Sequence, residues 1–73
     1  MTLDELSIGQ EAKVIHIHSG KELKRRLQSF GIVKGSFVTL TERTLKRNTF
    51  EVQIDRSMVA LRKGEAQKVE VEV

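Results

Sequence analysis

The sequence predicts a mainly β fold: a small β-barrel of about five strands with one inserted α-helix (about Gly20–Phe30) and short helical turns. The first observation is length, because 73 residues leave room for one domain, expected to span residues 1–73. The second is that apolar and polar residues alternate in several short segments, as in antiparallel strands that bury one face. The third is a single segment with apolar residues at helical spacing. We expect a closed or nearly closed barrel, because an open sheet would expose two long edges.

The alternation places the strands and their buried faces. In the first strand we expect Ile15 and Ile17 to point inward and Val14 to lie on the opposite face. The third strand alternates strictly from Phe50 to Ile54, with its apolar residues inward. The expected strands cover residues 12–18, 37–44, 50–54, 58–62 and 69–73.

The helix has a clear start and a clear end. Ser19 is the expected N-cap and Glu22 stands at the third helical position, which is the spacing of a capping box. Gly31 is expected to end the helix as a left-handed residue, where any side chain would be strained. Glu22 and Arg26 are four residues apart and can pair. The face that packs on the barrel carries Leu23, Leu27 and Phe30.

Two shorter helical turns are also expected. Thr2 and Glu5 carry a second capping-box pattern near the N-terminus. Residues 64–67 form a turn or a single helical turn before the last strand. The inserted helix is expected to cover one end of the barrel.

Composition excludes several classes of protein. The chain has no cysteine, which rules out a disulfide scaffold, a cysteine-ligated metal site and thiol chemistry. No stretch approaches the ~18 consecutive apolar residues of a membrane span, and the acidic segment Met1–Leu6 is unlike a secretory signal. We therefore expect a soluble, cytoplasmic protein without a cofactor. A net charge of +3 permits an acidic partner without requiring one.

Catalytic motifs are missing from the sequence. It contains no nucleophile paired with a base, no GxxxxGK[ST] phosphate loop and no metal triad. Gly31 and Gly35 do not form a phosphate loop, because no Lys-Ser or Lys-Thr pair follows them. We predict no catalytic and no cofactor-binding residue, and expect that the chain is not an enzyme. A groove for proline-rich peptides is also not expected, since such grooves use Tyr and Trp and the chain has neither.

His16 and His18 are weak candidates for a metal site. They lie two residues apart on the first strand and are expected to share a face. A transition-metal site normally needs three or four ligands, and no acid in the sequence is obviously placed to complete the set. The predicted role is therefore a histidine pair on the wet side of a strand, with no metal bound.

Two groups of residues are candidates for docking a partner. The first is the exposed face of the predicted helix, with Lys21, Lys24 and Arg25. The second is a loop-like segment with Arg43, Leu45, Lys46 and Arg47. An apolar anchor is common at interfaces, and loops on a rigid scaffold often carry function. The alternatives are a solvated helix face and an ordinary polar hairpin tip.

Two residue strings resemble a known family. They are Arg26-Leu27-x-x-Phe30-Gly31-Ile32-x-x-Gly35 and Ala60-Leu61-Arg62-x-x-Glu65-Ala66. In this order, and in a chain of this length, they resemble the ferrous iron transport protein A (FeoA) family. The resemblance implies a single FeoA-like, SH3-like β-barrel domain over residues 1–73, with a helix inserted after the first strand. Three turns depart from the family pattern, at Lys34, at residues 44–49 and at residues 55–57.

The resemblance also implies a function. FeoA-like proteins are cytoplasmic accessory or regulatory partners of FeoB-type transporters, which carry ferrous iron across the membrane and have a cytoplasmic GTPase domain. The chain would dock on that cytoplasmic part and meet the membrane only through its partner. Iron would be the cargo of the transporter.

Two alternative functions remain. A pI near 9.6 and two basic clusters are compatible with a small nucleic-acid-binding SH3-like barrel. Nucleic acid is nevertheless not the expected partner, because no aromatic stacking platform is evident. The second alternative is a regulatory domain like the SH3-like part of iron-dependent repressors, but the sequence shows no DNA-binding helical domain to accompany it.

Overall fold

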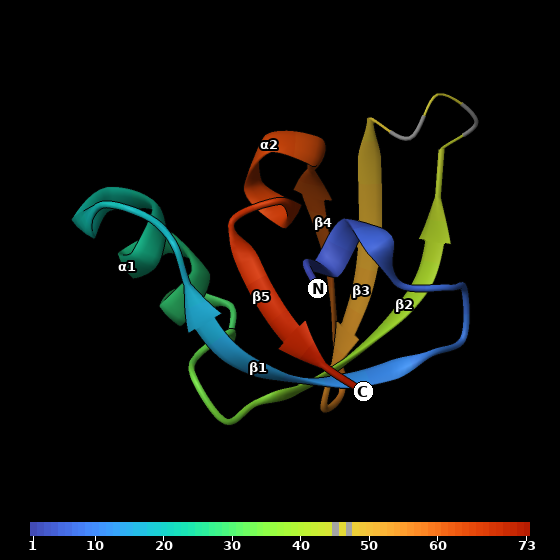
Figure 1. The fold of residues 1–73 in the computed structure, drawn as a ribbon, viewed down its shortest axis with the longest axis horizontal. Coiled ribbons are helices and arrows are strands. Elements are labelled where there is room, and N and C mark those ends of the chain that lie inside the picture. Colours follow the sequence, from blue (N-terminus) through green and yellow to red (C-terminus); the bar gives the residue numbers. More distant parts are fainter. Residues whose placement is uncertain (45, 47) are drawn as a thin grey trace.

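The computed structural model describes residues 1–44, 46 and 48–73. All five predicted strands and the predicted helix are present, so the mainly β fold is confirmed (Figure 1). The elements in chain order are a 3₁₀ turn η1 (Leu3–Glu5), β1 (Glu11–Ile17), α1 (Lys21–Ser29), β2 (Phe37–Arg43), β3 (Thr49–Ile54), β4 (Ser57–Arg62), α2 (Lys63–Ala66) and β5 (Val69–Glu72).

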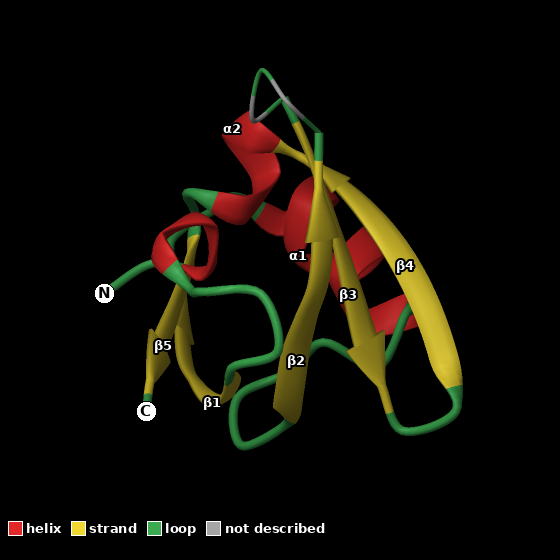
Figure 2. Ribbon diagram, turned by 90° about the vertical axis from the view of Figure 1, so that its right-hand side faces the viewer, coloured by secondary structure: helices red, strands yellow, loops and turns green. Residues whose placement is uncertain are grey.

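The five strands form one antiparallel sheet in the order β4-β3-β2-β1-β5. The sheet curves strongly, and Figure 2 shows β4 and β5 on opposite sides of the molecule. These two end strands do not pair with each other, so the expected closure into a barrel is incomplete. The sheet therefore keeps two edges, and what covers each edge bears on function.

The core fills the hollow of the curved sheet. Every element contributes at least one buried apolar side chain, and no polar or charged residue is buried among the described residues. The largest buried side chain is that of Phe50, and the inward alternation from Phe50 to Ile54 is confirmed. None of the helices in the described ranges is long and apolar enough to cross a bilayer.

The inward face of β1 differs from the prediction. Val14 is fully buried and Ile15 only half-buried, whereas Ile17 is buried as expected. The pairing of β1 with β5 shifts register between Val14 and His16, which marks a β-bulge. A bulge adds one residue and reverses the alternation beyond it. Residues three apart, Val14 and Ile17, can therefore both face the core, which simple period-two alternation did not allow.

The start of α1 also differs from the prediction by one residue. Gly20, not Ser19, is the N-cap, with an extended backbone at φ −72° and ψ 176°. No side chain caps the helix, and Glu22 occupies the second helical position rather than the third. Glycine is an acceptable N-cap because the position needs a non-helical backbone more than it needs a particular side chain. With its two caps, α1 covers the predicted range from Gly20 to Phe30.

The end of α1 forms as predicted. Gly31 adopts φ +88°, and its amide donates to the carbonyl of Gln28 at 2.9 Å. The amide of Ile32 donates to the carbonyl of Leu27, also at 2.9 Å. These two bonds are the Schellman motif, in which a left-handed residue satisfies the last helical carbonyls. Leu27 and Ile32 are both fully buried, so the turn is held by packing as well.

We predict that Gly31→Ala lowers the free energy of unfolding by about 1–2 kcal/mol, because L-residues are strained in the left-handed region. A Cβ at Gly31 would meet the Ile54 side chain only at an ordinary 3.5 Å, so the cost is backbone strain rather than a clash. Urea unfolding measures the change. Gly64→Ala is the matched control, since a Cβ there meets nothing within 4 Å and alanine favours a helix. Equal stabilities for the two variants would contradict the assignment.

Candidate docking surface

The helix α1 presents a basic face to solvent. Lys21, Lys24 and Arg25 are all exposed, as the sequence predicted. The opposite face packs on the core, through buried Leu27 and the half-buried Leu23 and Phe30. Figure 1 places α1 at one end of the molecule, beyond the end of β1. The basic residues are thus held on a helix that is packed on the core and projects from the sheet.

The second predicted docking cluster lies elsewhere. Lys46 is exposed in the connection between β2 and β3, while Leu45 and Arg47 lie outside the described residues. In Figure 1 the ends of β2 and β3 that flank this connection are far from α1. Arg43 serves the fold, because its Nη1 donates to the carbonyl oxygen of Leu6 at 3.0 Å. The structure therefore does not bring Lys46 beside the basic face of α1.

Arg26 joins the two residue strings that carried the family resemblance. It pairs with Glu65 and not with Glu22, because α2 brings a carboxylate of another element beside the helix. Oε1 of Glu65 also accepts the amide hydrogen of Arg62 at 2.9 Å, which caps α2. The guanidinium of Arg26 lies 5.5 Å from the ring centroid of Phe30, within the range of a cation–π contact. One carboxylate thus links α1, β4 and α2.

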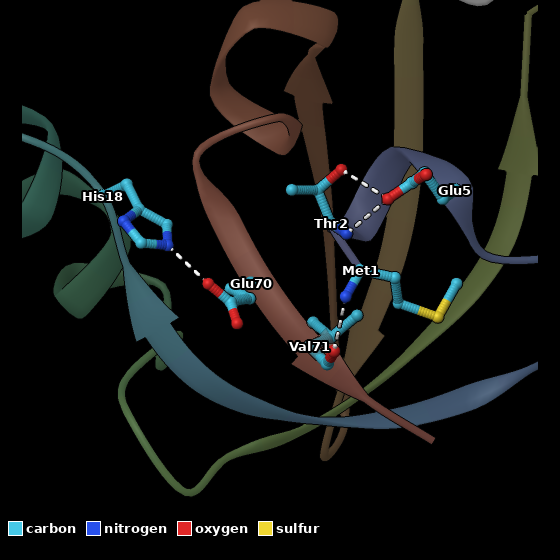
Figure 3. A network of polar contacts seen from close by, with 6 residues as sticks. All are labelled: Met1, Thr2, Glu5, His18, Glu70 and Val71. Carbon is cyan, nitrogen blue, oxygen red and sulfur yellow. Dashed lines mark hydrogen bonds and ion pairs between the residues drawn. The ribbon is translucent and has the colours of Figure 1, made fainter.

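The two histidines have an acidic neighbour that the sequence did not reveal. The rings of His16 and His18 meet edge to face with centroids 4.3 Å apart. Nε2 of His18 donates to Oε1 of Glu70 at 2.5 Å (Figure 3). Glu70 stands opposite His16 in the pairing of β1 with β5, so it is close in space but 52 residues from His18 in sequence. No three histidine or acidic residues in the described ranges form a group that could hold a metal ion.

The hydrogen bond from His18 lowers the pKa of Glu70 below its usual 4.5. At the opposite end of the chain, the backbone amide and hydroxyl of Thr2 lower the pKa of Glu5 in the same way. Glu5 accepts the Thr2 amide hydrogen at 2.7 Å, so this part of the predicted capping box is confirmed. Both carboxylates are at the surface, and their bonds are local supports rather than a reactive site.

The N-terminal residues cover the edge of β5. The amide of Val71 donates to the carbonyl of Met1 at 2.7 Å, and Thr2 bridges to Glu70. Figure 3 shows Met1 and Thr2 alongside the strand, with the terminal amino group directed at the Val71 carbonyl. The middle of this sheet edge is therefore already paired.

A groove lies between the end of α1 and β4. It has a volume of about 410 Å³ and is lined by Ser29, Phe30, Ser57, Met58, Val59 and Ala60. A smaller hollow of about 140 Å³ lies over β2 and β3, lined by Glu42, Arg43, Thr44, Thr49 and Glu51. Sequence reasoning missed the groove, because it forms between a helix and a strand that are separated by the whole of β2 and β3.

We predict that His18→Ala raises the pKa of Glu70 toward its usual value, since the hydrogen bond that lowers it is lost. A lowered pKa means that the contact stabilises the fold above about pH 4.5 and that this contribution is lost as the pH falls through the lowered value. A carboxyl NMR titration measures the shift. The pKa of Glu5 should stay the same, because its hydrogen bonds come from Thr2. An unchanged pKa of Glu70 would refute the contact with His18.

We predict that Glu65→Ala destabilises the fold more than Arg26→Ala. Arg26→Ala removes the ion pair, in which the arginine is half exposed, and the contact of the guanidinium with the Phe30 ring, which together cost about 1 kcal/mol. Glu65→Ala removes the same pair and the cap on the Arg62 amide, so the free energy of unfolding falls by about 1–2 kcal/mol. Urea unfolding of both variants and of the double variant gives the comparison. A larger loss for Arg26→Ala would refute the double role of Glu65.

Comparisons with known proteins agree with this structure. The family model of the FeoA domain matches residues 1–73. A Campylobacter jejuni protein named "Putative Fe(2+) transport protein A" is 44% identical over 71 residues, covering 97% of this chain and 96% of the relative. The solution structure of Chlorobium tepidum FeoA superimposes with a TM-score of 0.93 at 26% identity, covering 100% of this chain and 70% of that one.

The crystal structure of Stenotrophomonas maltophilia FeoA, complexed with zinc and described as a prokaryotic SH3 domain protein, is also similar. It superimposes with a TM-score of 0.84 at 33% identity, covering 99% of this chain and 89% of that one. The predicted SH3-like architecture is therefore confirmed. The full-length match, the curated relative and the shared fold show that the chain belongs to the FeoA family, whose relatives include the Fe(2+) transport proteins A.

Proposed function

We propose that the protein is a cytoplasmic accessory and regulatory protein of ferrous iron uptake. It docks on the cytoplasmic GTPase part of a FeoB-type membrane transporter and meets the membrane only through that partner. The family match over residues 1–73 is the observation that carries this proposal. The name of the Campylobacter jejuni relative supports the link to iron transport.

The basic face of α1 supports docking on an acidic surface. Lys21, Lys24 and Arg25 are exposed together on one helix. Complementary charge speeds the encounter of two proteins and sets their register. The segment with Leu45, Lys46 and Arg47 is a second proposed contact. Two separate contacts would fix the orientation of the partner better than one.

Binding without turnover is the proposed mode of action. No polar or charged residue is buried among the described residues, whereas catalytic acids and bases often owe their shifted pKa values to burial. Iron is proposed as the cargo of the transporter and not as a ligand of this chain. The accessory protein would act on the transporter by holding its cytoplasmic part in one arrangement.

Nucleic-acid binding is less well supported than docking on a protein. Binding of single strands usually uses several aromatic side chains as stacking platforms. Of the three phenylalanines, Phe50 is buried, Phe30 is half-buried and Phe37 alone is exposed. One exposed ring beside scattered basic residues does not make such a platform.

We predict that the protein binds the isolated cytoplasmic domain of the ferrous iron transporter of its own organism, measured by calorimetry at physiological salt. The double variant Lys24→Glu/Arg25→Glu should bind about tenfold more weakly, because it opposes the charge that steers docking. The protein alone should release no phosphate from GTP.

The matched control is Lys34→Glu/Lys68→Glu, which changes the net charge equally at exposed positions outside α1. It should bind as the unmodified protein does. Equal losses in both double variants would show that only net charge matters. Absence of any complex with the unmodified protein would refute the proposed function.

A further inference from the structure

We propose that the open edge of β4, with its groove against α1, binds an extended acidic segment of the partner as an added strand of the sheet. This inference rests on the proposed function, because the partner is the same cytoplasmic domain of the transporter. It goes further by naming the surface, the backbone groups and the conformation of the bound segment.

The two edges of the sheet differ in what pairs with them. At one edge, Met1 and Thr2 pair with β5. At the other edge, β4 pairs with β3 alone in the described part of the chain. Natural proteins commonly protect an open edge with inward charges, proline or a bulge. The pairing of β4 with β3 is continuous from Ser57 to Arg62, without a bulge.

The hairpin geometry identifies the backbone groups at the open edge. Ile54 and Ser57 pair across a two-residue turn, and the Lys63 amide donates to the Asn48 carbonyl at 2.9 Å. Bonded and non-bonded pairs alternate along an antiparallel ladder. The odd-numbered residues of β4 therefore bond to β3, and the amides of Met58 and Ala60 point outward.

The next outward amide in this series is that of Arg62, and it supports the assignment. It donates to the Glu65 carboxylate at 2.9 Å, away from β3. Among the described residues, no acceptor forms a hydrogen bond with the backbone amide of Met58 or of Ala60. The unpaired part of the β4 edge is therefore short and ends at α2. It can pair with a short extended peptide but not along the full length of a long strand.

The groove beside this edge is suited to an apolar side chain. Phe30 and Val59 are half-buried and pack against the core, and Met58 is 51% exposed. In an added strand, side chains alternate between the two faces. Every second side chain of the bound segment would therefore enter the groove between β4 and α1. Main-chain bonds supply affinity in this mode, and such pockets supply specificity.

The charges around the groove favour an acidic segment. Arg56 precedes Met58 in the turn and Arg62 follows Ala60 at the end of β4. Arg25 lies one helical turn before Ser29, which lines the groove. The nearby carboxylate of Glu65 is already engaged by Arg26. Two further carboxylates lie near this edge: Asp55 in the β3–β4 turn and Glu51, which pairs with Ala60 across the two strands. Three arginines against these two carboxylates leave the rim positive overall.

The test uses the unmodified ¹⁵N-labelled protein with the isolated cytoplasmic domain of the transporter. Hydrogen exchange followed by NMR should show slowed exchange of the Met58 and Ala60 amides in the complex. The Val59 and Leu61 amides, already bonded to β3, serve as internal references. Met58→Glu, which places a negative charge in the groove, should weaken binding about tenfold or more. Phe37→Glu is the matched control, because Phe37 is similarly exposed, at 58% against 51% for Met58, but lines neither groove nor edge.

The outcomes separate the two proposals. A complex that leaves exchange at Met58 and Ala60 unchanged overturns the strand-addition proposal while docking itself stands. A complex in which Met58→Glu binds as tightly as Phe37→Glu also overturns it. If the unmodified protein forms no complex with the domain, both proposals fail. Thermal melting of both variants shows that they remain folded.

Discussion

The left-handed turn at Gly31 fixes where α1 lies, and the proposed docking surfaces depend on it. The turn stops the helix at Phe30 and brings Leu27 and Ile32 together in the core. A side chain at Gly31 would lie against Ile54, so the end of the helix sits close to the end of β3. The same placement leaves Phe30 facing β4 across the groove and turns the basic residues of α1 toward solvent. A local backbone requirement thus determines a surface formed by distant segments.

The contact between Arg26 and Glu65 connects the two residue strings on which the family resemblance was based. Read separately, one string ends a helix and the other ends a strand. In the structure their charged members meet, and Glu65 simultaneously caps α2 through the Arg62 amide. The helix that carries the basic face is thereby tied to the end of the open strand. Neither string could be fully explained by its own local structure.

Features that depend on residues close in sequence could be predicted from the sequence. Features that depend on contacts between separate strands or helices could not. The five strands, the inward run from Phe50 and the helix stop at Gly31 follow from local periodicity and backbone preference. The burial of Val14 depends on a bulge that only the pairing with β5 reveals. Glu70 reaches His18 from another strand, and Glu65 replaces the expected local partner of Arg26. The groove likewise could not be predicted from the sequence of either segment that lines it.

The unequal edges of the sheet limit how this protein can assemble through its backbone. Runaway growth of a fibre requires every subunit to offer an unpaired strand on both sides. In the described residues, Met1 and Thr2 pair with the middle of one side through Val71 and Glu70, so the proposed strand addition is confined to β4. Joining of that kind ends after one event, whether the newcomer is a peptide or a second copy. The pairing of Met1 and Thr2 with β5 therefore prevents strand addition at β4 from continuing into a polymer.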